Sequence, residues 1–203
     1  MKHILKPAFA LFFIAVVSTV SLIAVKNATE KPIAENQKRT QEKMLREILV
    51  QASQFREVPV EAAFGSDGGS AMVWVEQAFE GLSGGETVGY VLQVVTREGY
   101  NKVDAINMMV GISATENTVA GVRILRQRET PGFGAKISKE SFYGRFDGLA
   151  LSPLTVVRGR ETNAGDFQII ASSTITTRAV IGAFNKAIEW YNSRGGGLNE
   201  QTD

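Results

Sequence analysis

Residues 171–180 read ASSTITTRAV and place five hydroxyl side chains within six consecutive positions. Apolar residues then recur at intervals of three and four, which predicts the buried face of a helix; they are Val180, Ala183, Phe184, Ala187, Ile188 and Tyr191. The hydroxyl cluster is therefore expected at a helix N-terminus, where backbone N–H groups are unpaired and the helix dipole is positive. Two interpretations remain open: Thr176 or Thr177 caps the helix, or the cluster binds a phosphate group.

The composition argues against several classes of protein and site. The chain has 203 residues, which suits one domain with an appendage. Its 22 basic and 21 acidic residues nearly balance, and this argues against nucleic-acid binding, which usually needs a basic face. The chain has no cysteine and a single histidine, His3, so we expect no metal site and no histidine general base. Redox or group-transfer chemistry would then require a bound organic cofactor.

The N-terminal region predicts a membrane anchor. Residues 7–25 carry no charge over 19 positions, which is enough for a helix to cross a bilayer. Lys2, His3 and Lys6 precede this run, and short positive flanks remain in the cytoplasm. We therefore predict a single-pass protein of the cell inner membrane whose C-terminal domain lies on the periplasmic or extracytoplasmic side. The alternative is a cleaved signal peptide, with residues 19–21 as its best cleavage site.

A helical stalk is expected after the anchor. Residues 28–51 are rich in charged residues and glutamine, and Pro32 suits the first turn of such a helix. Apolar positions concentrate near the end of this segment, where the stalk is expected to join the following domain; they are Ile33, Met44, Leu45, Ile48 and Leu49. The predicted boundaries are 1–26 for the anchor, 27–52 for the stalk, 53–192 for the domain and 193–203 for a mobile tail.

The domain has the pattern of an antiparallel sheet covered by helices. Apolar or alternating runs separated by turn signals predict strands at 72–75, 88–94, 103–112 and 119–125. Residues 81–86 are expected to form a loop, and helices are predicted at 139–146 and 177–193. This arrangement belongs to the α+β class.

A second informative stretch reads RETPGFGAKI at residues 128–137. Pro131 followed by Gly132 fits the two central positions of a type II turn. Gly134 would let the backbone approach a flat ligand closely, and Phe133 at the tip of the turn is placed to pack on a ring. The alternative is a turn that only connects two elements.

Four motifs follow one another along the chain: Gly99-Tyr100, MVGI at 109–112, GVRIL at 121–125 and ETPGFGAKI at 129–137. In order and spacing they resemble the FMN-binding domain of the G subunit of the Rnf electron-transport complex. The C subunit of the sodium-pumping NADH:quinone reductase is similar. The resemblance covers about residues 1–192, including the predicted anchor. In this family a threonine that ends a Ser/Thr-Gly-Ala-Thr motif carries FMN through a phosphoester, and the alignment places that threonine on Thr174.

The resemblance implies a cofactor site built from both stretches. Thr174 would carry the covalent FMN, and Ser173, Thr176 and Thr177 are candidates to bind its phosphate. The pocket would be shaped by Glu129, Thr130, Pro131, Gly132, Phe133 and Gly134. Asp166 matches an acidic residue of the family's modification segment, or else is a loop aspartate that accepts backbone hydrogen bonds. Ser172 replaces a glycine of the family pattern, and it fits most readily if its φ is negative.

The function that the resemblance implies is a relay of single electrons. The chain would be a subunit of an Rnf-type complex that moves electrons between reduced ferredoxin and NAD and couples this to ion movement. It would have no catalytic residue or metal of its own, because the flavin supplies the redox chemistry. Its partners would be other membrane and peripheral subunits, a flavin transferase that uses FAD and a metal, and the lipid bilayer. The alternatives are a flavin-free or non-covalent scaffold subunit, or an anchored extracytoplasmic domain with an unrelated ligand.

Overall fold

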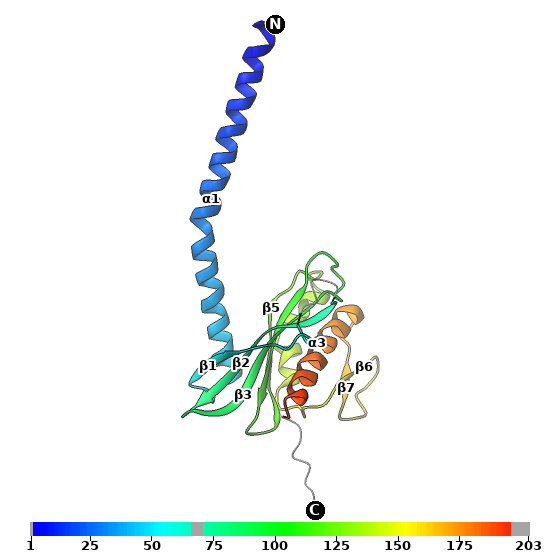
Figure 1. Cartoon of the computed structure of the whole chain (residues 1–203). Helices are drawn as coiled ribbons and strands as arrows, with labels where there is room; N and C mark the ends of the chain where they lie inside the picture. Colours follow the sequence, from blue (N-terminus) through cyan, green and yellow to red (C-terminus); the bar gives the residue numbers. More distant parts are fainter. Residues whose placement is uncertain (1, 66–70, 196–203) are drawn as a thin grey trace, which may run out of the picture. The chain divides into compact units, whose positions relative to one another are not determined.

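The computed structural model describes residues 2–65 and 71–195 (Figure 1). Within the first helix, side chains are described for residues 11–26, 28–29 and from 38 onward. The chain divides into two compact units, Met1–Lys43 and Met44–Asp203, and each is considered by itself. The predicted mobile tail falls mostly on residues 196–203, which lie outside the described residues.

Helix α1 (Lys2–Ile48) is one continuous element. The predicted anchor and most of the predicted stalk fall within it, so Pro32 lies inside the helix and not in a first turn, and the helix ends at Ile48, before the predicted stalk boundary at residue 52. The described apolar side chains of residues 11–25 are exposed to solvent. In the part of the chain that the structure describes, no helix meets both the length and the apolar character that a membrane crossing needs. Residues 7–10 of the predicted anchor have no described side chains.

The second unit is built on a five-stranded sheet in which each strand pairs antiparallel with the next along the chain. The strands are β1 (Gln54–Val58), β2 (Val73–Ser83), β3 (Glu86–Thr96), β4 (Ile106–Ser113) and β5 (Thr118–Arg126). The predicted α+β class and antiparallel meander are confirmed, and β1 is an addition to them. The start of β4 was predicted three residues too early, because residues 102–104 form a bend.

The loop predicted at 81–86 is wrong in its length. Strand β2 continues through Gly81, and only two residues, Gly84 and Gly85, connect it to β3. Both have positive φ values, +61° and +91°, as the tight two-residue hairpin turns require. Glycine adopts these angles without strain, so the strands can extend to within two residues of each other.

Three short helices and a small parallel sheet connect β5 to the last helix. They are η1 (Gly134–Ser138), α2 (Glu140–Tyr143), η2 (Gly144–Phe146), β6 (Thr155–Val157) and β7 (Asp166–Gln168), with β6 and β7 parallel. The helix predicted at 139–146 is therefore two short helices, because the chain tightens to a 3₁₀ turn at Gly144. The last helix, α3 (Thr174–Ser193), begins three residues before its predicted start.

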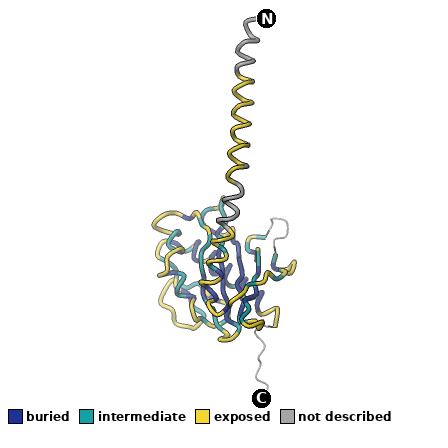
Figure 2. Tube along the Cα trace, turned by 90° about the vertical axis from the view of Figure 1, so that its left-hand side faces the viewer, coloured by how far each residue is buried: buried dark blue, intermediate teal, exposed yellow. Residues whose placement is uncertain are grey.

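The two faces of the sheet are covered by different helices. Helix α3 packs on one face, where Phe184 and Ile188 meet Leu92 and Val110 in the main core. Figure 2 shows that buried residues concentrate in the sheet and in the elements packed on it. The other face receives the apolar end of α1 in a smaller cluster, which includes Leu45, Ile48 and Leu49 together with Val91 and Met109.

Glycines on the sheet allow the end of α1 to approach its backbone. A Cβ atom added at Gly111 would lie 2.0 Å from Cγ2 of Ile48, and one added at Gly89 would lie 3.0 Å from Cδ1 of Leu49. The separation at Gly111 is far below a normal contact distance, and the Cβ atom at Gly89 would in addition lie 2.2 Å from the backbone oxygen of Ile112. A larger residue at either position would therefore force neighbouring atoms to move. The apolar residues at the end of the predicted stalk therefore contact the domain, as their pattern predicts.

Candidate functional site

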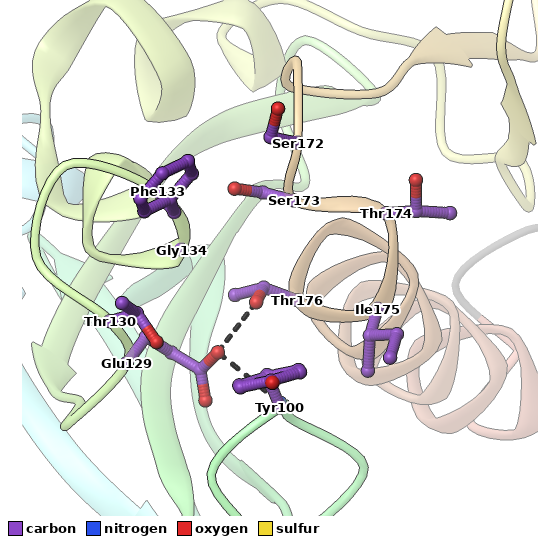
Figure 3. Close-up of a pocket in the computed structure, with 10 residues that line it drawn as sticks. All are labelled: Tyr100, Glu129, Thr130, Phe133, Gly134, Ser172, Ser173, Thr174, Ile175 and Thr176. Carbon is purple, nitrogen blue, oxygen red and sulfur yellow. Dashed lines mark hydrogen bonds between the residues drawn. The ribbon is translucent and has the colours of Figure 1, made fainter.

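A pocket of about 500 Å³ lies where the N-terminus of α3 meets the turn that follows β5 (Figure 3). This volume falls within the range of small-molecule binding sites. The pocket brings together the two stretches that the sequence singles out, although 33 residues separate them in the chain. Its lining residues are Tyr100, Glu129, Thr130, Phe133, Gly134, Ser172, Ser173, Thr174, Ile175 and Thr176.

The N-terminus of α3 presents hydrogen-bond donors without acceptors. Ser173 is the N-cap residue, but no side chain caps the helix. The first helical hydrogen bond runs from the backbone N–H of Thr177 to the carbonyl oxygen of Ser173 (2.9 Å), so the three preceding N–H groups have no acceptor within the helix. The interpretation of Thr176 or Thr177 as the cap is therefore wrong, because both lie inside the first turn.

The Ser173 hydroxyl adds one more unpaired group to this site. The residue is only 5% exposed, and its Oγ atom has no hydrogen-bond partner in the structure. Figure 3 shows the hydroxyl directed toward the turn that carries Phe133. Buried polar groups are rarely left without a partner, so an unpaired hydroxyl that lines a pocket indicates a place for a polar ligand group.

The three threonines of the cluster have different environments. Thr174 is half-buried at the start of α3 and makes no side-chain hydrogen bond to a described residue. Thr176 donates its hydroxyl to Oε2 of Glu129 at 2.5 Å. Thr177 is fully buried below the pocket, where its hydroxyl donates to the carbonyl oxygen of Ser173 (2.9 Å) and accepts from the N–H of Ile170 (3.3 Å). Thr177 thus does not reach the pocket, whereas Thr174 lines it.

The turn after β5 has the predicted type II geometry. The N–H of Phe133 donates to the carbonyl oxygen of Thr130 at 3.2 Å, and Gly132 has φ +78° at the third position, as this turn type requires. Pro131 and Gly132 form the turn without lining the pocket. The Phe133 side chain lines the pocket and is 50% exposed, so its ring is available to a planar ligand.

Glu129 is a buried carboxylate in the wall of the pocket. It is 4% exposed. Besides the Thr176 hydroxyl, it accepts hydrogen bonds from the backbone N–H groups of Tyr100 (3.2 Å) and Asn101 (3.1 Å). Glu129 therefore ties the turn after β3 to the first turn of α3. Among the described residues, no group of acidic, histidine or cysteine side chains is arranged to hold a metal ion.

Two pocket residues, Tyr100 and Ile175, were not predicted as site residues. Tyr100 was quoted only as part of a motif, and Ile175 only as an alignment point. Both side chains are exposed, at 64% and 47%. One local signal pointed to Ile175: it is an apolar residue between two hydroxyl residues in the first turn of a helix.

Ser172 departs from its expectation, because its φ is +63°. Ser172 therefore adopts a left-handed conformation that glycine adopts more readily. An L-residue in this left-handed region costs roughly 1–2 kcal/mol relative to a right-handed conformation.

Replacing Ser172 with glycine is expected to stabilise the protein. The gain in the free energy of unfolding is about 0.5–1 kcal/mol, because relief of the backbone strain is partly offset by the greater freedom of glycine in the unfolded chain. Urea denaturation of the whole chain measures it. Ser173→Gly is the matched control, since Ser173 has φ −138° and gains nothing from glycine. An Ser172→Gly protein no more stable than wild type would contradict this explanation.

Asp166 lies outside the pocket lining and organises a loop. Its Oδ2 accepts hydrogen bonds from the backbone N–H groups of Thr162 and Asn163, both at 2.9 Å, and from the Thr162 hydroxyl at 3.0 Å. The two backbone N–H bonds are the main reason that the pKa of Asp166 lies below its usual value. This geometry matches the interpretation of Asp166 as a loop aspartate.

Comparison with known proteins gives consistent matches. A family model described as "FMN-binding domain" matches residues 99–189, and one described as "RnfG N-terminal region" matches residues 1–48. The G subunit of the Na(+)-translocating ferredoxin:NAD(+) oxidoreductase complex of Acetobacterium woodii is 31% identical, over 95% of this chain and 93% of that protein. The G subunit of the ion-translocating oxidoreductase complex of Methanosarcina acetivorans is 28% identical, over 96% of this chain and 98% of that protein.

A solved structure shows the same fold. The crystal structure of Shewanella oneidensis NqrC matches with a TM-score of 0.50 and 15% sequence identity, over 73% of this chain and 84% of that chain. At this identity the match concerns the fold alone, and it agrees with the α+β architecture described above.

Proposed function

The chain belongs to the family of G subunits of ion-translocating oxidoreductase complexes, and we propose that it carries FMN as a phosphoester on Thr174 and relays single electrons. The chain is a subunit of an oxidoreductase complex, and its own fold includes an FMN-binding domain. The observation that carries the proposal is the pocket at the uncapped N-terminus of α3, which is lined by both Thr174 and Ser173, whose hydroxyl is unpaired.

The residues present fit a phosphate group at this end of the pocket. The unpaired N–H groups of the first turn and the positive end of the helix dipole favour an anion. The Ser173 hydroxyl can donate an additional hydrogen bond to a phosphate oxygen. Thr176 is less available for this role, because its hydroxyl is already bound to Glu129.

The turn side of the pocket fits a flat ring. A Cβ atom added at Gly134 would lie 2.7 Å from Oγ1 of Thr176 and 2.9 Å from Oε2 of Glu129, so only glycine leaves this wall open. Phe133 and Ile175 supply exposed apolar surface at the pocket. Ring stacking and apolar contact would orient the isoalloxazine, which accepts and releases electrons when bound.

Attachment requires an external catalyst. A threonine hydroxyl is a weak nucleophile without an adjacent base, and no described side chain accepts a hydrogen bond from Thr174. We therefore infer that a flavin transferase activates Oγ1 of Thr174 and supplies FAD. The Oγ1–phosphorus bond forms as the diphosphate bond of FAD breaks, AMP departs and the hydroxyl proton is lost.

The N-terminal half of α1 is proposed to anchor the protein in the inner membrane. Residues 7–25 carry no charge, and the described apolar side chains among them are exposed, so lipid would remove them from water. The preceding Lys2 and Lys6 favour a cytoplasmic N-terminus and an extracytoplasmic domain. The flavin would then exchange electrons with flavin or iron–sulfur centres of neighbouring subunits in the complex.

The test is the intact mass of the full chain after co-expression with a flavin transferase. We expect a gain equal to one FMN less one water, together with yellow colour that survives denaturation. Unmodified, colourless protein that still assembles with its complex would instead favour a scaffold role. Unmodified protein with which no membrane complex co-purifies would favour a domain with an unrelated ligand.

A further inference from the structure

The proposed phosphate site does not need the negative charge of Glu129. The carboxylate is 4% exposed and lines the pocket. Its three hydrogen-bond partners at the carboxylate are neutral donors: a hydroxyl and two backbone N–H groups. No ion pair joins Glu129 to a lysine or arginine in the described part of the chain.

Two glycines, Gly99 and Gly134, leave room for this carboxylate on two of its sides. A Cβ atom added at Gly99 would lie 2.6 Å from Oε1 of Glu129, and one added at Gly134 would lie 2.9 Å from Oε2. Both glycines are buried. Burial of a charge without an ion-pair partner is costly. A retained buried charge in a cleft therefore indicates a function for the charge itself.

We propose that the negative charge of Glu129 lowers the midpoint potential of the flavin bound in this pocket. The inference rests on the proposed function, because it assigns a role to Glu129 in the same site. The reaction is the transfer of one electron from a neighbouring iron–sulfur or flavin centre, which is oxidised, to the flavin, which is reduced. Added negative charge on the ring is opposed by the field of a nearby carboxylate, and burial weakens the screening by water. Glu129 thus makes the flavin a stronger electron donor to its next partner.

This role differs from a purely structural one in its effect on Glu129→Gln. Glutamine has nearly the same shape, and with its oxygen at the Oε2 position it can still accept from the Thr176 hydroxyl and the Tyr100 N–H, while the bond from the Asn101 N–H to Oε1 is lost. The link between the two turns through the Oε2 position is therefore kept, and the charge is lost together with one hydrogen bond. A structural role predicts an unchanged potential, whereas an electrostatic role predicts a more positive one.

The experiment is a spectroelectrochemical titration of the flavin-loaded full chain, in wild type and Glu129→Gln. We expect the midpoint potential of Glu129→Gln to be more positive, with about a tenfold higher ratio of reduced to oxidised flavin at a fixed applied potential. Glu86→Gln is the matched control. Glu86 is exposed at the opposite end of β3 from Tyr100, so its loss should leave the potential unchanged.

A second neutral variant keeps the test decisive if Glu129→Gln does not acquire flavin. The double variant Glu129→Met with Thr176→Val removes both partners of the 2.5 Å hydrogen bond, which avoids leaving one of them unpaired. It should show the same positive shift. Loaded neutral variants with the wild-type potential, or neutral variants that both fail to retain flavin, would overturn the inference alone. A wild-type chain without flavin would overturn the proposed function as well.

Discussion

A chain with Thr174→Ala is expected to fold normally and to carry no covalent flavin. Alanine removes the only side-chain oxygen at this position, so no phosphoester can form there, and the loss of label should be complete. The fold should tolerate the change, because Thr174 is half-buried, makes no side-chain hydrogen bond to a described residue and lies in the first turn of α3. Alanine also has the higher helix propensity. Intact mass and in-gel flavin fluorescence measure the outcome.

Thr174→Ser is the matched control for this prediction. It restores a hydroxyl at the same Cβ and should restore part or all of the label. Ser172 and Ser173 offer competing hydroxyls in the same pocket, so peptide mapping must assign the modified residue. Full labelling of Thr174→Ala, with loss of label in Ser173→Ala or Ser172→Ala, would show that the attachment site is a serine.

The start of α3 shows how far periodicity alone can locate an element. The apolar residues from Val180 onward predicted the helix and its buried face, and Phe184 and Ile188 are fully buried. The first three residues were missed because β-branched and hydroxyl residues have low helix propensity and favour caps. Their helical state depends on tertiary contacts such as the hydrogen bond from Thr176 to Glu129, which joins positions 47 residues apart.

The site was predictable in its parts but not in its connections. Local turn chemistry correctly gave the geometry of Pro131 and Gly132, because φ preferences act within a few residues. The resemblance placed Glu129 among the pocket residues without a contact for it. The position of its carboxylate between Gly99 and Gly134 depends on three segments that meet in space. No periodic pattern within one segment contains that information.

The largest loss of stability is expected for Phe146→Ala. Phe146 is fully buried, and its ring lies 5.8 Å from that of Phe142, 4.6 Å from that of Phe167 and 5.2 Å from that of Phe184. The variant should lower the free energy of unfolding by about 3–5 kcal/mol, since removal of a buried ring leaves a cavity. This is a large share of the roughly 5–15 kcal/mol typical of a folded domain. Urea denaturation with an unchanged m-value measures the effect.

Phe133→Ala separates this packing role from the role of the pocket. The same ring is removed, but Phe133 is 50% exposed, so the expected loss of stability is within about 0.5–1 kcal/mol. Phe133→Ala should instead alter the visible spectrum of the bound flavin, because the ring lines the pocket. Phe146→Ala should also affect the site indirectly, since Phe167 belongs to β7, which leads directly into the segment before Ser172. Equal losses of stability in the two variants would contradict the assignment of Phe146 to the core and Phe133 to the ligand.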